Sequence, residues 1–283
     1  MDDPRKKTPL AEDGGWQGPL KAYDNTAFLK SPDAREIRIL SEYLEPEKRF
    51  RDADVSDTIV FFGSARLQPE DVAKKNLDAA RAGEGDLATA ERNLAMSEYY
   101  EAARSLADRL TRWSKDLGPE SLRRFVICSG GGPGIMEAAN RGASEARGLN
   151  IGLNVSLPFE QEENPYITRN LAFEFHYFFM RKFWFVYLAK AMVFFPGGFG
   201  TLDEFFEVLT LVQTQKVRKH MPIVLFGKRF WDEIMDLGAL ARLGTISPED
   251  LELFLSTDSV DEAYDYLTRE LLGYALDKPG GQL

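Results

Sequence analysis

The sequence predicts an α/β protein: a Rossmann-like parallel sheet with helices on both faces and extra helices at the N-terminus. Short apolar runs alternate along the chain with longer segments whose apolar residues have helical spacing, which is typical of βαβ units. Three of these runs end directly in glycine-containing turns, at Gly63-Ser64, Gly130–Gly134 and Pro196–Thr201. Because parallel sheets bind ligands beyond the carboxyl ends of their strands, these turns are the expected location of a functional site.

The N-terminal part of the chain has two sections. Residues 1–30 are polar and rich in Gly, Pro and charge, so we expect a flexible tail. Ser31-Pro32-Asp33 then has the composition of a helix start, with Ser31 as the cap, and an apolar stripe continues to about Leu44. Since no linker is apparent after this point, residues 31–283 are expected to form a single domain with a helical N-terminal extension.

The expected strands are buried on both faces, as the strands of a parallel sheet are. In chain order they are Thr58–Phe62, Phe125–Cys128, Ile151–Val155, Ala172–Phe175, Ala191–Phe195 and Pro222–Phe226. Helical spacing predicts an exposed charged insertion over 67–90, a long packing helix over Leu94–Leu117 and a helix over Ile135–Ala146. Further helices are expected after Phe199, from Phe230 and over about Val260–Leu272.

Composition excludes several classes of protein. The 283 residues carry 35 basic and 45 acidic side chains, a net charge of −10, which argues against general attraction to nucleic acid. A phosphate would have to be bound locally, by backbone amides and a few cations. The single cysteine, Cys128, excludes an internal disulfide, and the two histidines, His176 and His220, exclude a histidine-rich metal site. We expect all three to have structural roles.

The sequence also bears on location. The first fifteen residues contain no apolar leader segment, and no stretch of the chain reaches the length of a membrane span. We therefore expect a cytoplasmic protein with no membrane partner.

The segment Lys190–Gln215 contains the strongest of the three turns. Its apolar run leads into Pro-Gly-Gly-Phe-Gly-Thr, after which apolar residues recur with helical spacing. Gly197, Gly198 and Gly200 can take positive φ and let the backbone approach a ligand, while Thr201 can cap the helix. Such a turn directs free N–H groups and a helix dipole at one point, which suits a phosphate.

Two acidic residues, Asp203 and Glu204, follow this turn. They have two interpretations. Carboxylates in a first helical turn complement the helix dipole. Alternatively, a phosphorylated substrate binds to the glycines, and a carboxylate faces its reacting carbon.

Two nucleotide-binding classes fit the glycine turns poorly. A nicotinamide dehydrogenase needs G-x-G-x-x-G at one strand–helix junction, and Gly130–Gly134 is interrupted by proline. A P-loop kinase needs a turn that continues into Gly-Lys-Ser/Thr, which is not found here.

Three motifs together resemble the LOG ("Lonely Guy") family. They are Ser-Gly-Gly-Gly-Pro-Gly-Ile-Met-Glu-Ala-Ala (129–139), Met180-Arg181-Lys182, and Pro-Gly-Gly-Phe-Gly-Thr-Leu-Asp-Glu (196–204). Order and spacing agree from about Thr58 to Leu225, and the long N-terminal region resembles the larger, bacterial-type members. The resemblance implies a Rossmann-like protein that hydrolyses the N-glycosidic bond of nucleoside 5′-monophosphates. Plant and some microbial members release cytokinins in this way.

The resemblance also implies the residues of the site. Arg181 and Glu204 match the catalytic pair. Residues implied or expected to bind substrate are Gly63, Ser64, Gly131, Gly132, Met136, Glu160, Lys182, Gly197, Gly198, Phe199, Gly200, Thr201, Asp203 and Thr210. The short members read M-H-x-R-K where this chain has Phe178-Phe179-Met180-Arg181-Lys182. Many relatives are labelled possible lysine decarboxylases, but no motif here frames a lysine for pyridoxal phosphate, and no cofactor is expected.

The chemistry of glycosidic cleavage suits these residues. A carboxylate stabilises the ribosyl cation-like state and activates water, which is the role expected for Glu204. Arg181 would hold the nucleotide and offset charge on the departing base, although an ion pair between helices is an equal alternative. Lys182 either attracts phosphate or is a solvated helix residue. The aromatic group around them is expected to be mostly core, with one or two rings free to stack on a base; it comprises Phe175, Tyr177, Phe178, Phe179, Phe183 and Trp184.

Three functions remain open at this level. The first is a phosphoribohydrolase that acts on AMP or an N6-modified AMP. The second is a non-catalytic nucleotide or molybdenum-cofactor carrier that uses the same pocket, and the third is an oligomeric scaffold. The presence of both Arg181 and Glu204 favours the hydrolase. A homodimer or larger homo-oligomer is expected, because the helices after Ala172 and Phe199 carry large apolar side chains on more than one face.

Overall fold

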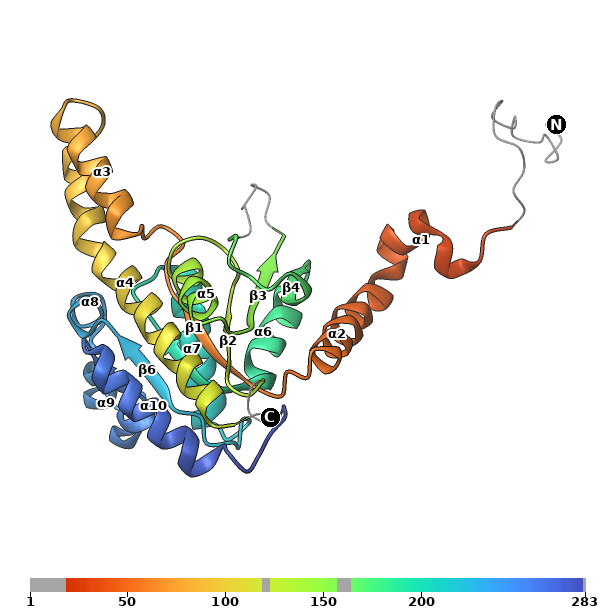
Figure 1. Cartoon of the computed structure of the whole chain (residues 1–283). Coiled ribbons are helices and arrows are strands. Elements are labelled where there is room, and N and C mark those ends of the chain that lie inside the picture. The colour runs from red at the N-terminus through yellow and green to blue at the C-terminus, as the bar shows by residue number, and fades with distance from the viewer. Residues whose placement is uncertain (1–18, 119–122, 157–163, 282–283) are drawn as a thin grey trace, which may run out of the picture. The chain divides into compact units, whose positions relative to one another are not determined.

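The computed structural model describes residues 19–118, 123–156 and 164–281 of the chain. The chain divides into two units, one ending at Ser41 and one beginning at Glu42. In the described residues, the second unit is built on a seven-stranded parallel sheet with the order β4-β3-β2-β1-β5-β6-β7 (Figure 1). The predicted α/β class, with helices on both faces of a parallel sheet, is confirmed.

The first unit is helical where it is described. It contains a 3₁₀ turn η1 (Ala22–Asp24), the short helix α1 (Thr26–Lys30), a second 3₁₀ turn η2 (Pro32–Ala34) and the beginning of α2 (Arg35–Asp52). The Asn25 side chain caps α1 by accepting a hydrogen bond from Phe28 N at 3.1 Å. Pro32 lies at the first position of its helix as predicted, but Ser31 forms no side-chain cap bond. The predicted helix exists, and it continues beyond Leu44 to Asp52.

All six predicted strands are present, with ends that shift by at most two residues. They are β1 (Thr58–Phe62), β2 (Val126–Ser129), β3 (Asn150–Val155), β4 (Ala172–Phe175), β5 (Ala189–Phe194) and β6 (Ile223–Phe226). A further strand, β7 (Leu255–Thr257), pairs with β6 at the edge of the sheet and was not predicted. It is too short, and has too few apolar residues, to show a periodic pattern.

The helices of the second unit mostly match the predicted segments. They are α3 (Glu70–Arg81), α4 (Leu87–Asp116), α5 (Ile135–Glu145), α6 (Phe178–Leu188), α7 (Phe199–Gln213), α8 (Lys228–Ile234), α9 (Leu237–Arg242) and α10 (Val260–Tyr274), with 3₁₀ turns η4 (Arg169–Leu171) and η5 (Pro248–Leu253). The charged insertion is α3 and the start of α4, which project from the sheet as a helical pair (Figure 1). A small cluster of Leu77, Ala80, Ala90 and Leu94 holds the pair together.

Each strand sends alternate side chains to opposite faces of the sheet, as strand geometry requires. On one face, Ile59 and Phe61 of β1 and Val193 of β5 are fully buried in a cluster with α4, α5 and α10. On the other face the layer is aromatic. Phe62 packs against Phe194 and Phe185, with ring centroids 5.0 and 4.9 Å apart.

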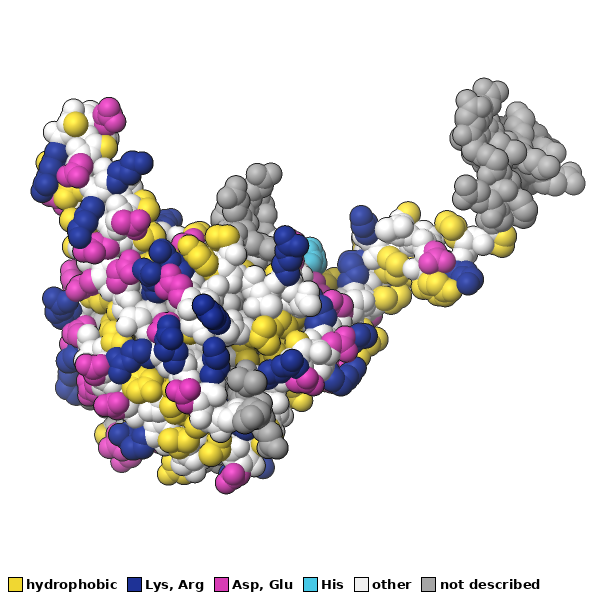
Figure 2. All heavy atoms as spheres, in the orientation of Figure 1, with side chains coloured by type: hydrophobic (Ala, Val, Ile, Leu, Met, Phe, Trp, Pro, Cys, Tyr) yellow, Lys and Arg dark blue, Asp and Glu magenta, His cyan; other side chains and the backbone are white. Residues whose placement is uncertain are grey.

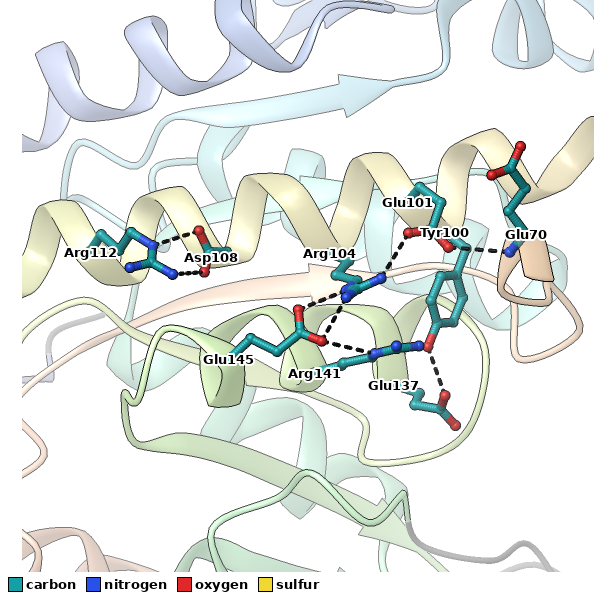
Figure 3. Close-up of polar contacts among 9 residues, drawn as sticks. All are labelled: Glu70, Tyr100, Glu101, Arg104, Asp108, Arg112, Glu137, Arg141 and Glu145. Carbon is teal, nitrogen blue, oxygen red and sulfur yellow. Dashed lines mark hydrogen bonds and ion pairs between the residues drawn. The ribbon is translucent and has the colours of Figure 1, made fainter. Parts of the chain in front are cut away.

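A polar clamp joins α4 to α5, the helix that follows the second glycine loop (Figure 3). Arg104 donates two hydrogen bonds of 2.7 Å to the carboxylate of Glu145, and the Tyr100 hydroxyl donates to Glu137 at 2.7 Å. The helices can approach this closely only because residue 142 is glycine. A Cβ at Gly142 would lie only 2.0 Å from Arg104 O. The hydrogen bonds from Arg104 hold the pKa of Glu145 below its usual range. This clamp fixes the position of α5 and therefore of the loop that leads into it.

A buried ion pair lies at the amino ends of β1 and β2. Arg124 donates from Nε to Asp57 at 2.7 Å, and Asp57 also accepts from Phe125 N at 2.7 Å. The side chains of Asp57 and Arg124 are 0% and 9% exposed. The bond from Phe125 N accompanies a left-handed backbone at this residue, with φ of 52°. This pair accounts for the later start of the second strand, at Val126 and not at Phe125 as predicted.

We predict that Asp57→Asn lowers the free energy of unfolding by about 3–5 kcal/mol, because it leaves Arg124 buried without a compensating charge. Urea denaturation measures the difference. Asp54→Asn is the matched control, since it removes one partner of the exposed Arg123–Asp54 pair and should cost about 1 kcal/mol or less. Equal losses in the two variants would contradict a structural role for the buried pair.

Candidate active site

The three predicted turns meet at the carboxyl edge of the sheet because β1 lies between β2 and β5. The loop after β1 joins the other two through one residue. Ser64 N donates to Pro196 O at 2.9 Å, and Ser64 O accepts from Ile135 N at 3.0 Å. Gly63 is required here for packing, since a Cβ would lie 2.7 Å from the side chain of Ile135. The roles of Gly63 and Ser64 in this structure are to connect the turns.

The loop after β2 is held by a buried network of amide side chains. Asn140 Oδ1 accepts from Ser129 Oγ at 2.6 Å and from Asn164 Nδ2 at 3.0 Å. Asn164 also donates to the backbone oxygens of Gly131 and Gly132, at 3.1 Å each. Sequence reasoning did not single out these asparagines. Asn140 could have been noticed as a polar residue on the apolar face of its helix.

Positive φ occurs at the glycines of this second loop and not at those of the Pro-Gly-Gly turn. Gly131 and Gly134 have φ of 75° and 71°. Gly134 begins α5, and a Cβ there would lie 2.2 Å from Ser64 O. No positive φ is found at Gly197, Gly198 or Gly200, although glycine would permit it there.

The Pro-Gly-Gly turn after β5 leads directly into α7. Gly198 is the N-cap residue, and the first helical hydrogen bond runs from Leu202 N to Gly198 O. The amides of residues 199–201 therefore precede the helical bonding pattern, as the first N–H groups of a helix do. Thr201, which could have capped the helix, is not the cap. It is buried, and its Oγ1 would lie 2.2 Å from a Cβ at Gly197.

Arg181 reaches the turns from α6. Its Nε donates to Leu153 O at 2.6 Å, and its guanidinium lies 5.0 Å from the ring centroid of Phe185. A Cβ at Gly130 would lie 2.5 Å from Arg181 Nη2 and 2.6 Å from Met136 Sδ. Glycine at position 130 thus makes room for Arg181, with Met136 beside it.

Glu204 of α7 faces Arg181. The closest N–O distance is 3.7 Å, and the two side chains are only 12% and 15% exposed. Burial raises the pKa of Glu204 to about 7, while the nearby Arg181 charge acts in the opposite direction. Burial likewise lowers the pKa of Arg181. The pair links α6 to α7 and also provides a carboxyl group that changes its charge near neutral pH.

Lys182 has different surroundings from its neighbour Arg181. Its Nζ pairs with Asp203 at 2.6 Å and with Glu207 at 3.1 Å, both on α7. Asp203 therefore contacts Lys182. Lys182 is therefore a second link between the two helices and not simply a solvated helix residue.

The other predicted residues are spread around this pair. Gly198 and Gly200 adjoin open space, and Phe199 is 93% exposed. Thr210 lies elsewhere on α7, where it lines an apolar cavity of about 100 Å³ together with Phe206, Leu240 and Phe254. Neither Arg181 nor Glu204 lines that cavity. Glu160 lies outside the described residues.

Asn154 is a further candidate that sequence reasoning missed. It lies near the end of β3, next to Gly131, whose Cβ would lie 2.9 Å from Asn154 Nδ2. This nitrogen is buried and has no hydrogen-bond partner in the described parts of the chain. Asn154 lies one residue after Leu153, whose carbonyl accepts the bond from Arg181.

The remaining aromatic and titratable residues follow the predictions in part. Phe175, Tyr177 and Trp184 are buried, whereas Phe178 and Phe179 are more than half exposed. His220 pairs with Glu270 at 3.0 Å, and His176 donates from its backbone to Glu42. Cys128 is buried, which raises the pKa of its thiol. No cluster of His, Cys, Asp and Glu suited to a metal ion occurs among the residues that the structure describes.

Residues 136–267 match the model of the family described as "Possible lysine decarboxylase", the label that many LOG relatives carry. The matched segment contains Met180-Arg181-Lys182 and the whole of the Pro-Gly-Gly turn with Glu204. This part of the chain therefore matches the LOG family. The match supports a phosphoribohydrolase-like role. No helix in the described ranges combines the length and apolar character needed to cross a bilayer.

Several solved structures are similar at low identity. The chain is 19% identical to the structural-genomics target TM1055, with a TM-score of 0.46 over 75% of this chain and 99% of that one. It is 17% identical to a molybdenum cofactor binding protein from Rippkaea orientalis, with a TM-score of 0.45 over 75% and 94%. It is 15% identical to a molybdenum cofactor carrier protein from Chlamydomonas reinhardtii, with a TM-score of 0.43 over 77% of this chain and 99% of that one. Similarity this low has no bearing on function. None of the curated proteins matches the chain at a significant level.

We predict that the stability advantage of the Glu204→Gln variant over the natural protein increases as the pH rises. The raised pKa means that folded Glu204 stays protonated while the unfolded chain ionises, so the natural protein loses stability from the ordinary value of 4.5 up to about 7. Glutamine does not titrate. Between about pH 5 and pH 8, the difference in unfolding free energy should move by about 2 kcal/mol in favour of the variant.

Urea denaturation at the two pH values measures this shift. Glu207→Gln is the control, because Glu207 lies on the same helix and pairs with Lys182 at its surface. A difference between Glu204→Gln and the natural protein that does not change with pH would contradict the buried, protonated state of Glu204.

Proposed function

We propose that this protein hydrolyses the N-glycosidic bond of AMP or an N6-modified AMP, the cytokinin riboside 5′-monophosphate, to free base and ribose 5-phosphate. The observation that carries the proposal is the buried Arg181–Glu204 pair beside the Pro-Gly-Gly turn. The three parts of the reaction each have a residue group suited to them: a phosphate site, a carboxylate and a cation.

The N-terminus of α7 is suited to the 5′-phosphate. The amides of residues 199–201 precede the first helical bond, and the helix dipole favours negative charge at this end. Gly198 and Gly200 leave open space next to these amides, so an anion can approach the backbone. The protein as a whole is acidic, with Lys and Arg interspersed among Asp and Glu on the face in Figure 2, so recognition of phosphate here is local.

The carboxyl group of Glu204 is suited to the bond-breaking step. A carboxylate stabilises positive charge that develops on the ribose and accepts a proton from the attacking water. Its pKa near 7 allows it to act as a base at neutral pH, because proton transfer is efficient when the pKa lies near the working pH. Arg181, 3.7 Å away, favours the ionised form and can also offset charge on the departing base.

We predict that the protein cleaves nucleoside 5′-monophosphates and leaves plain nucleosides intact, because binding of the remote phosphate positions the ribose for attack. Incubation with a panel of nucleotides, followed by quantification of free base and ribose 5-phosphate, tests this. Glu204→Gln should lower kcat by about 10²–10⁴-fold with little effect on nucleotide binding, since the phosphate site is made of backbone.

The controls distinguish the site from its surroundings. Glu207→Gln changes a carboxylate on the same helix that pairs with Lys182, and it should retain activity within about threefold. Gly198→Val places a side chain in the open space beside the amides and should weaken nucleotide binding. Equal cleavage of AMP and adenosine would refute the phosphate site. Tight nucleotide binding with no hydrolysis would indicate the alternative, a non-catalytic nucleotide or molybdenum-cofactor carrier.

We predict that the protein is a homodimer or a larger homo-oligomer, with its site near the subunit interface. Phe178 and Phe179 of α6 and Phe199 and Phe206 of α7 are all exposed, on the two helices that carry the Arg181–Glu204 pair. Exposed aromatic surface of this kind usually marks an association site. Sedimentation at micromolar concentration measures the mass, and a stable 32 kDa monomer that cleaves AMP would contradict this prediction.

A further inference from the structure

A polar cavity lies at the amino ends of the strands, which is the end of the sheet opposite the candidate active site. It has a volume of about 250 Å³, and it is formed by the start of β5, the loop before β6 and the end of α10. The side chains that line it include Lys190, Arg218, Lys219, His220, Tyr274 and Lys278. The glycine turns follow the carboxyl ends of the strands, whereas this cavity adjoins their amino ends.

Positively charged side chains line the cavity, although the net charge of the protein is −10. Four of its lining residues are Lys or Arg, and no described residue among them is a carboxylate. In the part of the chain that the structure describes, none of these four cations has an ion-pair partner within 4.0 Å. Two acidic residues near the cavity form ion pairs with other residues. Glu270 pairs with His220, and Asp57 pairs with Arg124.

Lys190 is the most informative of the four cations. It is 2% exposed, and across the described ranges its ammonium group has no hydrogen-bond partner. Burial lowers its pKa, although Asp57 acts in the opposite direction. A buried ammonium group without a partner is costly, so structural lysines are normally paired.

Lys219 lies beside Lys190 and is also mostly removed from solvent. Its Nζ donates to Val186 O at 2.6 Å and to Tyr187 O at 3.0 Å, which holds the ammonium group in place. Burial, together with the charge of Lys190, lowers the pKa of Lys219 to about 7. Two neighbouring lysines, one buried and one partly buried, whose charges repel each other form an arrangement that an anion between them would stabilise.

We propose that this cavity binds the phosphoryl group of a small metabolite, with Lys190 and Lys219 as its inner ligands and Arg218 and Lys278 at its rim. The phosphoryl class fits because several cations converge on one small polar volume, and phosphate oxygens accept several charge-assisted hydrogen bonds at once. Nothing in this proposal depends on the reaction at Glu204. It assigns a second, separate anion site.

The test is binding of inorganic phosphate and of pyrophosphate to the full chain, measured by calorimetry and by the shift in Tm. Chloride at equal ionic strength serves as the reference. The titrations are performed both in the natural protein and in a Gly198→Val background, where the proposed substrate phosphate site is obstructed. The expected result is saturable binding of one anion per chain and a Tm that rises with phosphate and not with chloride.

Lys190→Met removes the buried charge at similar volume and should weaken phosphate binding about tenfold or more, as expected for loss of one charge-assisted hydrogen bond. Lys75→Met is the matched control, since Lys75 is exposed on α3 and does not line the cavity. It should bind phosphate like the parent. If Lys190→Met does not fold, Lys278→Met at the exposed rim replaces it, with a loss of about threefold or more expected.

Unchanged binding in the folded cavity variant would overturn the proposal, and so would equal Tm shifts with phosphate and chloride. Binding that disappears in the Gly198→Val background and persists in Lys190→Met would assign the anion to the α7 turn instead. Absence of AMP hydrolysis would leave this result unaffected, so failure of the proposed function and failure of the second site are distinguishable.

Discussion

The placement of β1 between β2 and β5 determines where chemistry can occur in this protein. Two hydrogen bonds at the backbone of Ser64, one to Pro196 and one from Ile135, join three strand ends that are far apart in the sequence. The Pro-Gly-Gly turn, the Ser-Gly-Gly-Gly loop and the helices that follow them are therefore fixed relative to one another. Arg181 and Glu204 can form a defined pair only because this edge of the sheet is rigid.

Burial gives that pair its properties. In water, a carboxylate and a guanidinium at 3.7 Å would interact weakly, and each would keep its ordinary pKa. Here, both side chains are largely buried, and burial raises the pKa of Glu204 to about 7. The more exposed group on the same two helices, Lys182 with Asp203 and Glu207, adds a link between them. Burial thus distinguishes Glu204 from the more exposed carboxylates of Asp203 and Glu207 on the same helix.

The two ends of the sheet use charge in opposite ways. At the carboxyl ends, one cation and one carboxylate balance each other beside free backbone amides. At the amino ends, Asp57 and Arg124 form an ion pair with each other. Lys190 and Lys219, in contrast, have no ion-pair partner among the described residues. In this acidic chain, four cations that have no ion-pair partner among the described residues thus line the same cavity.

The sequence by itself determined the α/β class, six of the strands and the main helices, and it singled out Arg181 and Glu204, which the structure brings together. These follow from local patterns: apolar runs, helical spacing and glycine after a strand. Only the tertiary structure decided which glycines need positive φ, that Gly130 makes room for Arg181, and that Asn140 and Asn164 hold the second loop. It also decided that Lys182 faces α7 and that Lys190 and Lys219 share a cavity. These features depend on residues distant in the chain, so no local pattern encodes them.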